Sequence, residues 1–128
     1  MKLDYIGGFN EYEENILRLY NFNMSQAIKF RNLVQDVVVN RNQKLDLSKV
    51  DFIENGDYNL ILGLFKTDEG ILSNDNKNFI CALTLNGFNN MLKLLEPFCN
   101  KETKSYQYLY DLDNPTDFLF SPVGTLLS

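Results

Sequence analysis

The sequence contains no histidine, and this absence excludes several kinds of active site at once. Ser-His-Asp and Cys-His nucleophilic systems need an imidazole base, and the usual zinc sites use imidazole ligands. Carboxylates remain as a source of general acid–base catalysis. The candidates are neighbouring acids on polar stretches, a pattern more typical of a solvated surface than of an active site: Glu11, Glu13, Glu14, Asp68 and Glu69. We therefore expect that the protein is not an enzyme.

Cysteine is scarce as well. Cys81 and Cys99 lie in unrelated contexts and form neither a metal-binding spacing nor a disulfide framework. This favours a reducing compartment, with both thiols acting as small buried hydrophobic groups. The first residues carry an acid, Asp4, and the pair Gly7-Gly8 where a signal peptide would need an apolar run. No apolar stretch approaches the ~20 residues of a membrane span. We expect a cytoplasmic protein without a membrane partner.

Basic residues are few and scattered, and the formal net charge is −5. A surface that follows nucleic-acid phosphates needs clustered lysine and arginine, so we expect no nucleic-acid partner. No lysine or arginine follows Lys104, whereas Asp111, Asp113 and Asp117 do. A field of this sign attracts basic partners, although solubility also explains an acidic composition.

Cofactor motifs are missing. The pair Gly7-Gly8 lacks the preceding buried strand and the following helix of a phosphate-binding or dinucleotide-binding loop. Residues 111–117 superficially resemble a calcium loop. However, Thr116 stands where the sharp turn needs glycine, and Pro122 stands where a bidentate glutamate should close the site. A turn between two strands explains the same residues. We expect no cofactor and no metal.

Two segments have the spacing of amphipathic helices. Apolar residues recur at helical intervals over about residues 24–39, where Asn23 and Gln26 are spaced as a capping box. A second series begins near residues 84–86, and Pro97 marks its end or a kink. Together with alternating strand residues, these faces predict a core that contains Phe30, Val34, Val37, Leu60, Leu62, Leu92 and Leu95.

Short apolar runs predict strands around the two helices, in chain order 16–20, 50–53, 58–64, 79–83, 106–110 and 118–120. Asn55-Gly56-Asp57 predicts a hairpin between the second and third of these strands. Residues 68–76 read as a polar connection, and the fourth strand, apolar on both faces, suits the centre of a sheet. The 128 residues therefore predict a single α+β domain, residues 1–128, with a two-layer, mostly antiparallel sheet and two α-helices packed on one face.

Tyr106, Tyr108 and Tyr110 recur with the period of two that places side chains on one face of a strand. Tyrosine packs its ring at small entropic cost while its hydroxyl stays solvated, which suits a partner surface. A half-buried sheet face under a helix explains the same spacing, but neighbouring aspartates favour recognition of a basic partner. The predicted partner-binding residues are Tyr106, Tyr108, Tyr110, Asp111, Asp113 and Asp117, and the acidic run at residues 11–14 is the second choice.

The chain resembles the small, acidic, single-domain immunity proteins that are encoded beside bacterial polymorphic or contact-dependent toxins. Residues 106–111 (YQYLYD) and 118–125 (FLFSPVGT) carry the resemblance, and they contain no functional motif. The resemblance implies a protein that binds and blocks a cognate toxin without catalysis. The alternatives are another regulatory or structural interaction module, or a small carboxylate-dependent enzyme or ligand binder.

Overall fold

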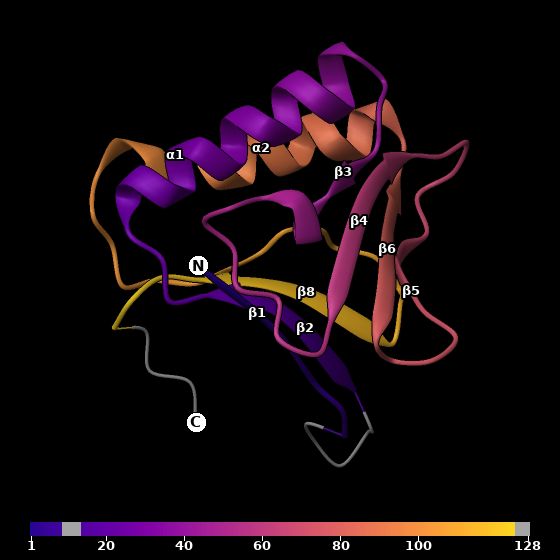
Figure 1. The fold of residues 1–128 in the computed structure, drawn as a ribbon. Helices are drawn as coiled ribbons and strands as arrows, with labels where there is room; N and C mark the ends of the chain where they lie inside the picture. The colour runs from indigo at the N-terminus through magenta and orange to yellow at the C-terminus, as the bar shows by residue number, and fades with distance from the viewer. Residues whose placement is uncertain (9–13, 125–128) are drawn as a thin grey trace.

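The structure is a computed structural model that describes residues 1–8 and 14–124 (Figure 1). These residues form two α-helices and eight strands, and a π-helix continues the first α-helix. In chain order the elements are β1 (Lys2–Ile6), β2 (Asn15–Tyr20), α1 (Met24–Leu33), the π-helix (Val34–Asn40), β3 (Leu45–Asp46), a 3-10 turn (Leu47–Lys49), β4 (Asn59–Leu64), β5 (Gly70–Leu72), β6 (Asn78–Leu83), α2 (Leu85–Asn100), β7 (Gln107–Tyr108) and β8 (Thr116–Ser121).

The strands form two four-stranded sheets, which confirms the α+β class. Sheet A has the order β1-β2-β8-β7, and sheet B has the order β3-β4-β6-β5. Four of the six strand pairings are antiparallel, as expected, but the central pair of each sheet is parallel: β2 with β8, and β4 with β6. A single sheet was expected from the sequence. Local patterns identify strands but not their partners, and β2 pairs with a strand from the far end of the chain.

The two helices lie side by side across one side of the molecule, with sheet A beneath them and sheet B beside it (Figure 1). Buried residues from both helices and both sheets belong to one hydrophobic cluster. All the predicted core residues are buried except Val37, which is half-buried. Phe22 and Phe120 lie at the centre of an aromatic group, with ring centroids 4.0 Å apart. Truncating either ring to alanine should cost about 3–5 kcal/mol.

The start of α1 follows the predicted capping box. The Asn23 side chain accepts from the Gln26 backbone at 2.9 Å, and the Gln26 side chain accepts from the Asn23 backbone at 3.2 Å. The predicted single helix over residues 24–39 is instead an α-helix to Leu33 followed by a π-helix from Val34 to Asn40. The change leaves Val34 and Val38 fully buried.

The predicted strand at residues 50–53 is wrong. This segment is turn and irregular chain, and only Glu54 forms an isolated bridge, to Lys2 of β1. A turn does exist at residues 55–58, where Gly56 has a φ of +58°, but it joins no pair of hydrogen-bonded strands. The predicted polar connection at residues 68–76 contains the edge strand β5.

The second half of sheet B agrees better with the sequence. β6 lies between β4 and β5, the central position that its two-sided apolar pattern predicts. Thr84 caps α2 by accepting from the Gly87 backbone at 3.1 Å, and the Asp68 carboxylate accepts from the Thr84 backbone at 2.7 Å. Pro97 lies inside α2, which continues to Asn100.

Side-chain alternation gives sheet A two distinct faces. Phe120 of β8 stacks on Phe30 of α1 with ring centroids 5.7 Å apart, so that face packs against the helices. The intervening residues of the strands point to the opposite face, which we call the outer face of sheet A. The register places four residues in one row across this face, and these are Asp4, Arg18, Leu119 and Tyr108.

Candidate partner-binding surface

Tyr106 and Tyr108 lie at the edge of sheet A. Tyr106 immediately precedes the short strand β7, and Tyr108 is its last residue. Their rings form an edge-to-face pair with centroids 5.9 Å apart, and their exposed fractions are 49% and 38%. Tyr108 is paired with Leu119 of β8, and directly opposite residues share a face. The pair therefore presents two partly exposed rings at the edge of sheet A.

Tyr110 does not share this surface. The predicted strand 106–110 is only Gln107–Tyr108, and Tyr110 is 8% exposed. Its hydroxyl accepts a hydrogen bond from the Ile71 backbone at 3.0 Å and donates one to the carbonyl of Thr116. Burial raises the pKa of Tyr110, so the hydroxyl stays protonated. The expectation of three tyrosines on one face is therefore wrong for Tyr110, because its hydroxyl satisfies backbone groups of β5 and β8.

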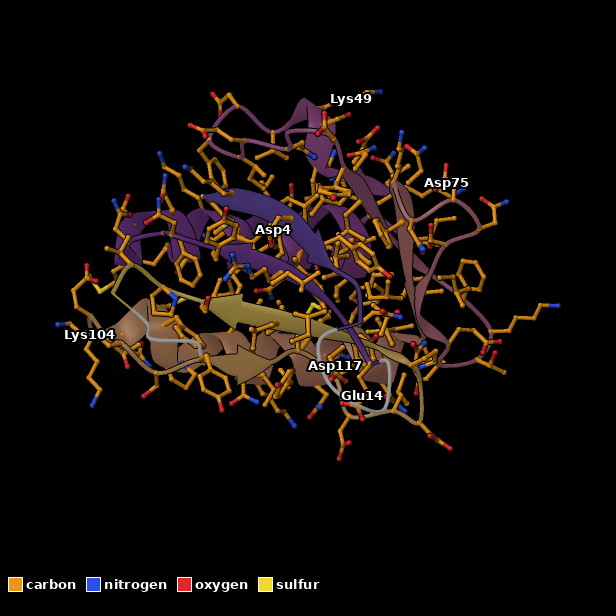
Figure 2. The ribbon with its side chains drawn as sticks, turned by 90° about the horizontal axis from the view of Figure 1, so that it is seen from below. Asp4, Glu14, Lys49, Asp75, Lys104 and Asp117 are labelled. Atoms are coloured by element: carbon orange, nitrogen blue, oxygen red, sulfur yellow. The ribbon has the colours of Figure 1, made fainter. Side chains whose placement is uncertain are left out.

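Among the acids, Asp117 has the largest effect on the pKa of Tyr108. It lies on the outer face of β8, and Figure 2 shows it next to Glu14, which immediately precedes β2. Burial raises the pKa of Asp117, and repulsion from Glu14 and Asp111 raises it further. The pKa of Tyr108 is also raised, by burial first and then by Asp117, Tyr106 and Glu14. These mutual effects define one acidic cluster: Asp111, Asp117 and Glu14 beside Tyr108.

The acidic cluster borders a hollow of about 350 Å³ between α2 and the strands β7 and β8. Two residues of α2, Asn90 and Leu94, line the hollow together with the acids Asp111 and Asp117. The remaining wall residues are Gln107, Tyr108, Tyr110 and Leu112. A hollow with converging polar groups at this scale can accept one or a few side chains of a partner.

Charge on the outer face is compensated in one place and not in another. Arg18 makes two hydrogen bonds to Asp4, at 2.6 and 2.9 Å, and its guanidinium lies 3.9 Å from the centroid of the Tyr20 ring. In contrast, neither Asp111 nor Asp117 forms an ion pair with any lysine or arginine among the described residues. Asp111 and Asp117 therefore keep their negative field, which a cationic group could neutralise.

The structure separates the predicted site residues into three groups. Tyr108, Asp111 and Asp117 line the hollow, and Tyr106 packs against Tyr108 beside it. Tyr110 is largely buried in the wall of the hollow. Asp113 is exposed on the neighbouring turn and does not line the hollow. Of the second-choice acidic run, Glu14 joins the cluster, and Glu11 and Glu13 lie outside the described residues.

Sequence reasoning missed the contribution of α2. Asn90 and Leu94 are four positions apart and therefore share one face of the helix, but nothing in the local sequence connects that face with residues 107–117. The parallel pairing of β2 with β8 was missed too, and this pairing brings Glu14 beside Asp117. Both contacts depend on tertiary structure.

The residues that resembled a calcium loop form a turn in which the Thr116 backbone donates to the Asn114 side chain at 2.8 Å. Within residues 1–8 and 14–124, no three acidic, cysteine or histidine side chains are placed to hold a metal ion. In the same part of the chain, no helix has the length and apolar content that crossing a membrane requires. Comparison of the chain with models of known protein families finds no match, and comparison with curated proteins finds none either.

Proposed function

We propose that this protein is a non-catalytic protein-binding module, an immunity protein that acts in the cytoplasm and neutralises a cognate bacterial toxin by direct binding. Its partner is a basic protein domain. The observation that carries the proposal is the acidic cluster beside two exposed tyrosines, bordering a hollow that can receive a partner side chain. The resemblance of residues 106–111 and 118–125 to immunity proteins agrees with it.

The electrostatics of Asp117 support a cationic partner. Its raised pKa means that the ionised carboxylate is less favourable in the folded protein than in the unfolded chain. Sites that lower stability in this way are typical of functional surfaces, because binding supplies what the free protein lacks. A lysine or arginine placed between Asp111 and Asp117 would neutralise the repulsion and lower the pKa of Asp117.

The exposed tyrosines supply the short-range part of the proposed interface. Aromatic residues are enriched among the residues that dominate binding energy, and truncating such an anchor typically costs about 2 kcal/mol or more. Tyr106 and Tyr108 support each other through their edge-to-face contact, so each ring is held in place before a partner arrives. The acids would then accelerate encounter, and the tyrosines would slow dissociation.

The test is affinity capture of the partner from the organism that encodes this chain, combined with sequencing of the adjacent reading frames. The expected result is a basic protein encoded beside this gene, whose toxicity is suppressed when the two are co-expressed. A variant with Tyr106→Ala and Tyr108→Ala should lose capture, whereas the matched control Phe65→Ala, which truncates a ring of similar exposure (44%) outside the site, should retain it. Retention of the partner by the tyrosine variant would contradict the proposed surface.

The hollow also favours a second candidate, a small carboxylate-dependent enzyme or ligand binder. Two carboxylates face one cavity, and one of them has a raised pKa, which is the arrangement that general acid–base catalysis uses. The two functions differ in what Asp117→Asn does. Loss of a turnover that the wild-type protein shows would support the enzyme, whereas slower association with a protein partner would support the binding module.

A further inference from the structure

The chain contains two Asn-Gly pairs, and the fold places them in opposite environments. Asn55-Gly56 lies in a turn that the Tyr58 backbone closes by donating to the Asn55 carbonyl at 3.1 Å. Gly56 has a φ of +58°, and a Cβ atom built on it would meet no atom within 4 Å. Its backbone N–H forms no hydrogen bond with any described residue. The Gly56 nitrogen is therefore not held by a hydrogen bond to a described residue, and the space beside its Cα is open.

We propose that Asn55 is a site of spontaneous deamidation in the folded protein. The backbone nitrogen of Gly56 attacks the side-chain carbonyl carbon of Asn55, and glycine offers no side chain to hinder the approach. A new C–N bond forms as the bond from the side-chain carbon to the Asn55 amide nitrogen breaks. The proton of the Gly56 N–H passes through water to the departing nitrogen, which leaves as ammonia, and a five-membered succinimide results. Water then opens the ring at either carbonyl and leaves aspartate or isoaspartate. The reaction needs only water.

Asn86-Gly87 is the internal control. It lies in the first turn of α2, where the Gly87 backbone donates to the Thr84 hydroxyl at 3.1 Å. A Cβ atom at Gly87 would lie 2.6 Å from a carboxylate oxygen of Asp68, so the space beside this glycine is closely filled. Ring closure here requires the first turn of the helix to open, because helical backbone angles hold the nitrogen away from the side-chain carbonyl.

Conversion of Asn55 would remove a hydrogen-bond donor that the fold uses. In one orientation the amide donates to the Asn59 side chain at 3.1 Å. In the other it donates to the carbonyls of Leu47 and Ile53, at 3.2 and 3.3 Å. A carboxylate can only accept and would face oxygen atoms in both cases. The backbone carbonyl of the neighbouring Glu54 accepts a hydrogen bond from the Leu3 backbone of the edge strand β1 at 2.9 Å. Deamidation of Asn55 should therefore weaken this hydrogen bond.

The experiment is peptide mapping by mass spectrometry of the full chain after incubation in mildly alkaline buffer, folded and in urea. In the folded protein the Asn55 peptide should convert at least about tenfold faster than the Asn86 peptide, since the helix must first open locally. In urea the two rates should converge. Equal rates in the folded protein, or faster conversion at Asn86, would overturn the proposal.

Amide hydrogen exchange tests the structural consequence separately. Asn55→Asp should increase exchange of the Leu3 amide relative to the wild-type protein. Asn74→Asp makes the same charge change at an exposed position on the loop between β5 and β6 and should leave Leu3 protected. Unchanged exchange in Asn55→Asp would show that the amide does not hold this edge, and would overturn that part of the inference.

Discussion

Replacing Tyr110 with phenylalanine removes one oxygen atom from the joint between the two sheets. The Tyr110 hydroxyl accepts from the Ile71 backbone of the edge strand β5 at 3.0 Å and donates to the Thr116 carbonyl of β8. The Asn114 side chain completes the joint by donating to the carbonyl of Glu69 at 2.6 Å. Exposed strand edges invite pairing with other chains, and here two side chains cap the edge of β5.

The cost of Tyr110→Phe follows from what it leaves unpaired. Ile71 is 4% exposed, so water cannot easily replace the lost acceptor, and a buried unsatisfied donor costs about 1–3 kcal/mol. With a urea m-value of about 2 kcal/mol/M, a loss of ~2 kcal/mol lowers the unfolding midpoint by about 1 M. Urea titration followed by circular dichroism measures this shift, and hydrogen exchange should show loss of protection at Ile71 in particular.

Tyr108→Phe is the matched control, because it deletes the same atom from a ring that is 38% exposed. Its stability should stay within about 0.5 kcal/mol of the wild-type protein, as for most surface substitutions. If Tyr110→Phe were no more destabilising than Tyr108→Phe, the Tyr110 hydroxyl would not be holding the sheets together.

Three further predictions concern stability. Gly70→Ala should destabilise the fold by about 1–3 kcal/mol, because Gly70 has a φ of +80° and a Cβ atom there would lie 2.8 Å from the Tyr110 ring. Thermal unfolding measures this loss of stability, and an unchanged unfolding midpoint would contradict the packing. The pKa of Tyr110 is raised by burial, so the folded state holds the phenol proton more tightly than the unfolded chain does. The resulting contribution to the free energy of unfolding should be fully present below about pH 10 and should be lost as pH rises further. This decline should be smaller in Tyr110→Phe. The pKa of Asp117 is raised by burial, Glu14 and Asp111, so the stability it contributes at low pH is lost as pH rises through that pKa. Asp117→Asn should therefore be more stable than the wild-type protein at neutral pH and little different in acid, and a less stable variant at neutral pH would refute the repulsion.

The features that the sequence predicts well are those set by neighbours along the chain. Asn23 and Gln26 form the capping box because their spacing alone determines the contact. α2 forms from an apolar series at helical intervals, and Thr84 begins it. The central position of β6 follows from apolar residues on both faces of a short run. Each inference uses fewer than about twenty consecutive residues and a known period.

The features that the sequence could not predict depend on distant contacts. β5 has only three residues between polar stretches, and its outer edge is completed by Tyr110 and Asn114 from the far end of the chain. Three of the four residues at 50–53 are apolar, but the segment has no strand partner, so apolar content alone misled the prediction. Tyr110 continues the period of two, but β7 ends at Tyr108. The Tyr110 side chain instead reaches β5, where its hydroxyl accepts a hydrogen bond from the Ile71 backbone.

The proposed surface, the central claim, is tested most directly by association and dissociation rates of the captured partner, measured at several salt concentrations. Combined Asp111→Asn and Asp117→Asn changes should slow association and flatten its salt dependence, whereas Tyr106→Ala and Tyr108→Ala should speed dissociation. Asp113→Asn removes a charge from the same segment at a position outside the hollow, so it distinguishes a role of Asp111 and Asp117 from the overall charge of residues 111–117. It should change the association rate less than the combined Asp111 and Asp117 changes do. Unchanged rates in both the acid and the tyrosine variants, with the fold intact, would contradict the account and place the interface elsewhere.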